Sequence, residues 1–151
     1  MKSVITTSCE KAEAPMKLLL EADPKKEHVI DYIKRGDVFV AEEAGIVIGV
    51  MVLLPTRPGT LEVVNIAVSG SYRGKGVGSR LLQFAAEAAE GYENLETGTG
   101  NSSIGQLLFY QRNGFRIDHV DKDFFVKQYD EDIWENGIQC RDMIRLVKTI
   151  E

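Results

Sequence analysis

The sequence predicts a single α+β domain that spans residues 1–151. Three runs rich in β-branched residues lie between Val38 and Val68, separated by turn residues, which is typical of an antiparallel meander. Apolar residues then recur with a helical period from Gly76 to Glu90. A chain of 151 residues with 44% hydrophobic content is sufficient for one buried core, and no repeat or linker divides it.

The N-terminal part is expected to form one strand and two helices. Lys2 to Thr7 has strand composition, and Glu13 to Glu21 has a helical apolar pattern that ends before Pro24. Asp23 and Pro24 suit an N-cap and a first helical position, so a second helix is expected to begin there and to end at Gly36. The meander strands that follow are Val38 to Glu43, Ile46 to Leu54 and Leu61 to Val68.

The second half of the chain alternates between helix and strand. Gly91 ends the helix that begins near Gly76, and a short strand is expected from Asn94 to Thr99. A second helix follows the Ser102-Ser103 caps and ends at Asn113, with Gly114 behind it. Two long strands are then expected, Phe115 to Val126 and Ile138 to Val147, around the polar segment Tyr129 to Gly137.

Charge and cysteine usage exclude several classes of protein. A formal charge of −5 and a pI near 5.2 argue against a nucleic-acid binder, because such binding depends on neutralising phosphates. Cys9 and Cys140 lie far apart without metal-ligand spacing, so no metal is expected. The N-terminus does not resemble a signal peptide, and no apolar run reaches the roughly 18 residues of a membrane span, so a reduced cytoplasmic protein is expected.

The most informative stretch is the strand, turn and helix from Leu61 to Arg80. Its turn, residues 73–78, reads RGKGVG, and we refer to it as the hexad. The glycines leave backbone N–H groups unobstructed, and the following helix presents its positive dipole end at the same place. The hexad therefore predicts an anion site, and the flanking strand and helix indicate a phosphate.

Two common phosphate motifs do not fit the hexad. A P-loop would need glycine at the position of Ser69, and Ser or Thr at the position of Gly76. A dinucleotide fingerprint would need glycine at the position of Ser79 and an acidic residue at the end of the next strand, whereas Glu96 lies inside that strand.

The stretch resembles instead the GNAT family of N-acyltransferases. The family motif is Gln or Arg, two residues, Gly, one residue, and Gly or Ala, and it is matched by Arg73, Gly76 and Gly78. The strand end NIAV and the later segment LFYQRNGF are also similar to the family, so the markers extend from about Val38 to Phe115. The segment ENGIQCRDMIRL resembles a small bacterial branch with some members labelled indole-acetate acetyltransferases, a label that these residues do not support chemically.

The resemblance implies a mixed, mostly antiparallel sheet of roughly six to seven strands, splayed by a bulge at the cofactor cleft and flanked by about four helices. It also implies acetyl-CoA as co-substrate and no metal. The pyrophosphate would lie on the amides of Gly74 to Ser79, and the pantetheine would pair with Ile66 to Val68 like an added strand. The implied cofactor residues are Ile66, Ala67, Val68, Arg73, Gly74, Lys75, Gly76, Val77, Gly78 and Ser79, with Asn101 or Ser103 as a pantetheine contact.

Acetyl transfer to an amine needs a neutral amine, stabilisation of the oxyanion and a proton for the leaving thiolate. The resemblance assigns Tyr110 as the acid and Glu62 as the base that takes the amine proton, often through water. A backbone N–H near Ile66 or Ala67, turned toward the cleft by the bulge, would meet the oxyanion. The alternatives are a packed aromatic for Tyr110, an exposed strand residue for Glu62, and helix caps for the Asn101 and Ser103 side chains.

Two functions remain open from the sequence. The first is direct transfer of the acetyl group to a primary amine of a small molecule or peptide, since no Cys or Ser nucleophile constellation favours a covalent intermediate. A homodimer is compatible with this function. The second is a coenzyme A binding or sensing module without turnover. The acidic balance favours a cationic amine, Asn65 is a candidate substrate or water ligand, and the loop YDEDIWENG is either a wall of the acceptor pocket or a solvated turn.

Overall fold

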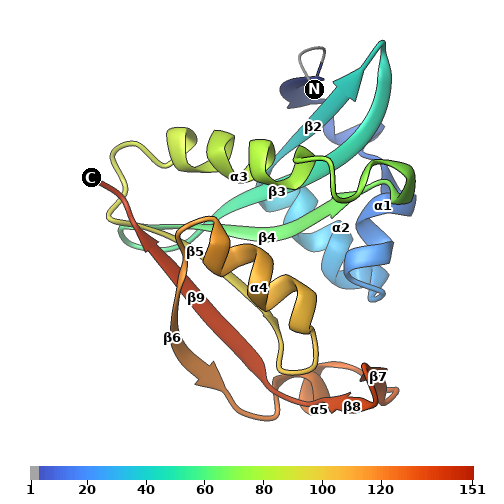
Figure 1. The fold of residues 1–151 in the computed structure, drawn as a ribbon, viewed down its shortest axis with the longest axis vertical. Helices are drawn as coiled ribbons and strands as arrows, with labels where there is room; N and C mark the ends of the chain where they lie inside the picture. Colours follow the sequence, from blue (N-terminus) through green and yellow to red (C-terminus); the bar gives the residue numbers. More distant parts are fainter. Residues whose placement is uncertain (1–3) are drawn as a thin grey trace.

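A sheet of seven strands in the order β1-β2-β3-β4-β5-β9-β6 runs through the molecule (Figure 1). The structure is a computed structural model and describes residues 4–151. Neighbouring strands are antiparallel except for β4 and β5, which confirms the predicted α+β class and the mixed, mostly antiparallel sheet. The strands are β1 Val4–Cys9, β2 Asp37–Glu43, β3 Ile46–Arg57, β4 Thr60–Val68, β5 Asn94–Gly100, β6 Arg116–Asp121 and β9 Met143–Thr149, and a separate hairpin joins β7 Ile133–Glu135 to β8 Ile138–Cys140.

Helices cover both faces of this sheet. One face packs on α3 and α4 around Leu81 and Tyr110, and the other packs on α1 and α2 around Leu19 and Val29 (Figure 1). Within residues 4–151, no helix is long and apolar enough to cross a membrane. The helices are α1 Met16–Ala22, α2 Lys26–Arg35, α3 Val77–Ala88, α4 Ile104–Arg112 and the short α5 Phe124–Gln128, with 3-10 turns at Lys11–Glu13 and Gly70–Tyr72.

The sheet opens between β4 and β5. These two strands pair in parallel only from Thr60 to Val63, opposite Asn94 to Thr97. The register between β3 and β4 shifts at this point, so that Val64 is an extra residue and forms a bulge. The expected splaying by a bulge is therefore present, although the bulge lies earlier in the strand than the predicted position at Ile66 or Ala67.

The N-terminal helices differ from the prediction. Of the strand expected at Lys2 to Thr7, residues 1–3 lie outside the described part of the chain, and β1 continues to Cys9. The second helix begins at Lys26, so the predicted start at Asp23 and Pro24 is wrong. The Asp23 carboxylate does not cap the helix, because it accepts hydrogen bonds from the Tyr32 and Tyr129 hydroxyls. A tertiary contact replaces the local cap.

The C-terminal strands are shorter than predicted. The strand expected from Phe115 to Val126 stops at Asp121, and α5 occupies the remainder. The strand expected from Ile138 to Val147 is divided into β8 and β9. The division has a clear cause, because the Asn101 carboxamide oxygen accepts hydrogen bonds from the N–H groups of Arg141 and Asp142, which turns the chain away from a continuous strand.

An ion pair between the half-exposed Arg57 and the buried Glu96 links β3 to β5. The Glu96 carboxylate is 1% exposed and accepts two hydrogen bonds from the Arg57 guanidinium, at 2.9 and 3.1 Å. Removal of one partner of such a pair leaves a buried charge without compensation.

Replacing Arg57 by Ala is therefore expected to destabilise the fold by about 2–3 kcal/mol, less than for a fully buried pair because Arg57 is half exposed. Urea unfolding followed by circular dichroism measures this change. The matched control is Arg35→Ala, which removes an exposed pair with Asp31 and should change stability by less than about 0.5 kcal/mol. Equal effects of the two substitutions would contradict the structural role of the Arg57 pair.

Candidate active site

Two adjoining cavities occupy the opening between β4 and β5. The first, of about 650 Å³, lies between β4, the hexad and α4, and we call it the hexad cavity. The second, of about 390 Å³, lies between β4, the start of α4 and the segment 129–137, which contains β7 and which we call the C-terminal loop. We call this cavity the acidic cavity because three carboxylate residues line it. Both cavities are lined by Glu21, Ala22, Ile66 and Gln106, so they are two parts of one cleft.

The hexad forms one end of the hexad cavity. Gly76 is the N-cap of α3 with φ of 87°, a left-handed conformation that glycine adopts without strain. A Cβ atom built on Gly74 or Gly76 would meet nothing within 4 Å, so the space in front of the turn is open. No side chain caps the first N–H groups of α3. The turn therefore offers free backbone donors and a positive helix end to an anion.

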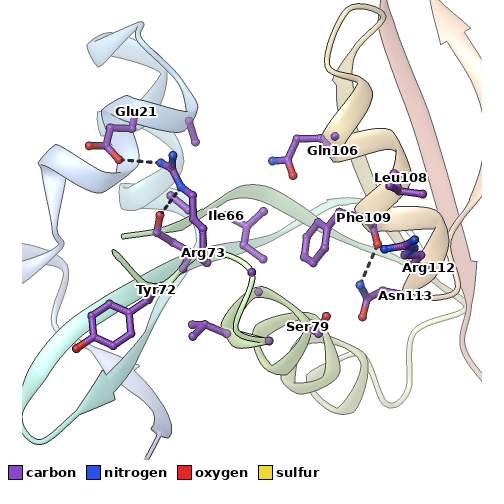
Figure 2. A pocket seen from close by; sticks show the side chains of 18 residues that line it. Glu21, Ile66, Tyr72, Arg73, Ser79, Gln106, Leu108, Phe109, Arg112 and Asn113 are labelled. Atoms are coloured by element: carbon purple, nitrogen blue, oxygen red, sulfur yellow. Dashed lines mark hydrogen bonds and ion pairs between the residues drawn. The ribbon is translucent and has the colours of Figure 1, made fainter. Parts of the chain in front are cut away.

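Two guanidinium groups line the same cavity. The Arg73 side chain crosses it, with Nε donating to the Val68 carbonyl at 3.1 Å and Nη2 lying 3.5 Å from the Glu21 carboxylate (Figure 2). Arg112 lines the cavity from α4. Lys75 does not line it, because its ammonium lies over the Tyr72 ring, 5.5 Å from the centroid.

One edge of β4 faces the cavity without a neighbouring strand. The Ser69 N–H donates to the Ile48 carbonyl, and ladder bonds in an antiparallel pair alternate along the strand. The backbone groups of Ala67 therefore hydrogen-bond to β3, whereas those of Ile66 and Val68 point toward the opening. The contact of Arg73 with the Val68 carbonyl agrees with this direction. The edge can receive an extended ligand as an additional strand.

Helix α4 forms the opposite wall, which the sequence analysis did not assign. Gln106 and Phe109 extend from α4 toward Ile66 (Figure 2). A Cβ atom on Gly78 would lie 2.8 Å from the Phe109 ring, so this glycine allows α3 and α4 to approach each other. Helical spacing was the available signal, because residues three, four and seven apart share one face. The lining residues on that face of α4 are Gly105, Leu108, Phe109 and Arg112.

The acidic cavity gathers carboxylates and aromatic rings from distant segments. Glu21 and Asp23 come from the end of α1, whereas Tyr129, Ile133 and Glu135 come from the C-terminal loop. Three residues of the loop therefore line a cavity, and the acceptor pocket stays a prediction. Trp134 points elsewhere, since it is 62% exposed and lines neither cavity.

Tyr110 lies in the wall of the acidic cavity. Its side chain is 3% exposed, lines the acidic cavity with Ile66, and makes a hydrogen bond with the Thr97 side chain. Burial raises the pKa of the phenol above its ordinary value, and the Thr97 hydrogen bond opposes this only in part. The phenol therefore carries its proton at neutral pH and is able to donate it.

Glu62 lies outside both cavities. Its carboxylate accepts a hydrogen bond from Arg145 at 3.2 Å, and burial raises its pKa although the Arg145 charge lowers it. Asn65, on the same strand, lines the acidic cavity. The structure thus places Asn65 in the wall of the cleft and Glu62 outside it.

The two alternative pantetheine contacts are also separated. The Asn101 side chain lines neither cavity, because it donates to Gln139 and accepts from Arg141 and Asp142. Ser103 lines the acidic cavity, and its hydroxyl donates to the Glu135 carboxylate at 2.7 Å. Within the described residues, no group of three or more His, Cys, Asp or Glu side chains is arranged to hold a metal ion.

An opened sheet with a free strand edge, unobstructed backbone N–H groups at a helix start and a buried tyrosine suit an acyltransferase that uses a coenzyme A thioester. Comparison with known proteins agrees with this class. Residues 34–117 match the family model described as an acetyltransferase (GNAT) domain.

Related proteins extend the match over nearly the whole chain. The Bacillus subtilis N-acetyltransferase YvbK is 55% identical over 131 residues, which cover 85% of this chain and 84% of that protein. The structure of an IAA acetyltransferase from Bacillus cereus is 51% identical, with a TM-score of 0.94, over 98% of this chain and 100% of that chain. A GNAT family acetyltransferase from Elizabethkingia anophelis with acetyl-CoA bound is 40% identical, with a TM-score of 0.96, over 99% and 100% of the two chains.

The protein belongs to the GNAT family of acetyltransferases. The resemblance drawn from Arg73, Gly76 and Gly78 is confirmed at the level of family and fold.

Proposed function

We propose that the protein transfers the acetyl group of acetyl-CoA directly to a primary amine of a small molecule or peptide. The observation that carries this proposal is the meeting of the hexad cavity and the acidic cavity at Ile66, beside the buried Tyr110. One cavity suits an anionic cofactor and the other suits an acceptor. A cofactor and an acceptor bound in them would meet where the two cavities adjoin, which is where the acetyl group would be transferred. A sensing module would need the first cavity alone, so the second cavity favours the enzyme.

Acetyl-CoA supplies the acetyl group as an activated thioester, and the hexad cavity fits its anionic and extended parts. The amides from Gly74 to Ser79 would hold the pyrophosphate, with charge from Arg73 and Arg112. The free edge at Ile66 and Val68 would pair with the pantetheine. Lys75 would act through its charge alone, since its side chain lies over Tyr72.

Three groups of this chain would perform the chemistry. The Ile66 N–H, on the free edge of β4, would donate to the thioester oxygen as negative charge develops there. The Tyr110 hydroxyl would protonate the departing sulfur. Glu62 would receive the amine proton through water, because its side chain lines neither cavity and its pKa is raised toward that of a useful base.

The name of the Bacillus cereus relative is not carried over to this chain. An acceptor of the indole-acetate type presents a carboxylate, and the three carboxylate residues that line the acidic cavity would repel it. An amine acceptor meets no such repulsion.

Replacing Gly76 by Asp is expected to weaken acetyl-CoA binding by roughly a hundredfold or more, because a carboxylate then faces the pyrophosphate. Isothermal titration calorimetry measures the affinity. The matched control is Gly45→Asp in the β2–β3 turn. Both glycines have positive φ, 79° and 87°, and open space for a side chain, so the backbone strain is similar. Micromolar binding by the Gly76 variant would contradict the placement of the pyrophosphate.

Replacing Tyr110 by Phe is expected to lower kcat by roughly a hundredfold while acetyl-CoA affinity stays within about twofold, since only the proton donor is removed. The assay measures amine-dependent release of free thiol from acetyl-CoA. Tyr92→Phe is the control, because Tyr92 lines neither cavity. Thiol release by the wild-type protein that no amine increases would favour the sensing module, and full turnover by the Tyr110 variant would exclude this acid.

Replacing Glu62 by Gln is expected to lower kcat by roughly a hundredfold and to change the pH profile. The wild-type carboxyl must be ionised to accept a proton, and its raised pKa means that activity falls with decreasing pH at a pH above 4.5, the ordinary value for Glu. The variant should lose this acid limb. Profiles of kcat between about pH 5 and 9 at saturating amine measure it, with the exposed Glu90→Gln as control. A wild-type profile in the Glu62 variant would exclude this base.

A further inference from the structure

All charged residues that line the acidic cavity in the described chain are acidic. Glu21, Asp23 and Glu135 line it, and no Lys, Arg or His among residues 4–151 does so. The hexad cavity next to it contains Arg73 and Arg112. The cleft is thus divided into a part that attracts anions and a part that attracts cations.

A buried amide gives independent support for a ligand in the acidic cavity. Asn65 is 5% exposed and lines the cavity. Its Nδ2 donates to the Leu19 carbonyl at 3.0 Å and to the Tyr32 hydroxyl at 2.7 Å, whereas its Oδ1 has no hydrogen-bond partner among the described residues. A buried acceptor without a donor is unfavourable, so this wall of the cavity is suited to a ligand N–H.

The three carboxylates differ in how many hydrogen bonds and ion pairs they already make. Asp23 accepts hydrogen bonds from the Lys25 N–H and from two tyrosine hydroxyls, and it lies 3.9 Å from His28. Glu21 is paired with Arg73. Among residues 4–151, the hydrogen-bond partner of the Glu135 carboxylate is the Ser103 hydroxyl, at 2.7 Å. Glu135 therefore keeps the most capacity for a positively charged ligand.

Aromatic rings complete the same wall. The Phe125 and Tyr129 rings both line the cavity and are stacked with centroids 5.6 Å apart. The acceptor must also meet a chemical requirement, because the attacking nitrogen has to be neutral to react with a thioester. The positive charge that the cavity recognises must therefore belong to a second group of the acceptor, joined to the first by a chain that can lie along these rings.

We propose that the acceptor is a small diamine or polyamine whose distal ammonium binds Glu135, with an amine N–H donating to Asn65 Oδ1. This inference rests on the proposed function and names its substrate class. The near amine forms the new N–C bond to the acetyl carbon while the C–S bond breaks. The amine loses one proton to the base, the sulfur gains one from Tyr110, and the distal ammonium keeps its charge throughout.

A series of three acceptors of similar length tests the charge of the distal group. 1,4-Diaminobutane, n-butylamine and 4-aminobutanoate carry the same primary amine, with a positive, absent and negative charge at the other end. We expect kcat/KM to decrease in this order, by up to about fivefold at each step, as for an exposed charge pair. Equal values for the three compounds, or a preference for 4-aminobutanoate, would overturn the inference.

Variants of Glu135 test whether this residue recognises the charge of the distal group of the acceptor. Glu135→Gln should reduce the preference for the diamine over n-butylamine to about twofold, and Glu135→Lys should favour 4-aminobutanoate over the diamine, a reversal of the sign of selectivity. Acetyl-CoA affinity should stay constant, which shows that the variants are folded. Glu131→Gln and Glu131→Lys, exposed in the same loop, are the matched controls and should keep the wild-type order.

The outcomes separate the two proposals. Amine-dependent thiol release without charge preference retains the acetyltransferase and removes the diamine acceptor. Absence of thiol release with all three amines, while acetyl-CoA still binds, contradicts the proposed function itself and the inference with it. Selectivity that survives in both Glu135 variants also overturns the assignment of this residue.

Discussion

The separation of β4 from β5 after Val63 is the constraint on which the cleft depends. These strands are the one parallel pair among the described strands, and they stay together over only four residues of each. The Thr97 hydroxyl donates to the Val63 carbonyl at 3.3 Å, at the last paired position, and Tyr110 is hydrogen-bonded to the same threonine. The Tyr110 hydroxyl, the proposed proton donor, is therefore held at the point where the sheet opens.

The opening also determines how charge is distributed. On one side, β4 leads through a short turn into the start of α3, so backbone N–H groups and the helix dipole give a positive potential without any fixed lysine. On the other side, the end of α1 and the C-terminal loop bring carboxylates together. Glu21 and Arg73 meet at the boundary, 3.5 Å apart. An acceptor and a cofactor of opposite charge would each be attracted to a different end of one cleft.

The sequence predicted the features that depend on local geometry. The hexad, the NIAV strand and the two helices after it could be found because turn residues, helical period and spacing are properties of neighbouring residues. Asp23 was interpreted as a cap, whereas its partners are Tyr32 and Tyr129, and Tyr129 lies more than a hundred positions later. Asn101 was one of two candidate pantetheine contacts, whereas its carboxamide binds the backbone that follows β8. Contacts of this kind have no local signal, and the same holds for Glu21 and Glu135 in the acidic cavity.

The backbone polar groups that face the cleft are unpaired because of the bulge in β4, and not because β4 or β5 is too short to continue the pairing. β5 continues to Gly100 beyond the last residue paired with β4, and β4 continues to Val68. Each strand keeps a partner on its outer edge, since Gly98 to Gly100 pair with β9 and Ile66 to Val68 pair with β3. Both inner edges therefore have the length to continue the ladder. The extra residue at Val64 turns β4 away from β5. A buried donor or acceptor that is left without a hydrogen-bond partner costs about 1–3 kcal/mol. A ligand that enters as a strand recovers part of this free energy, so the same distortion that weakens the sheet strengthens the binding of an extended substrate.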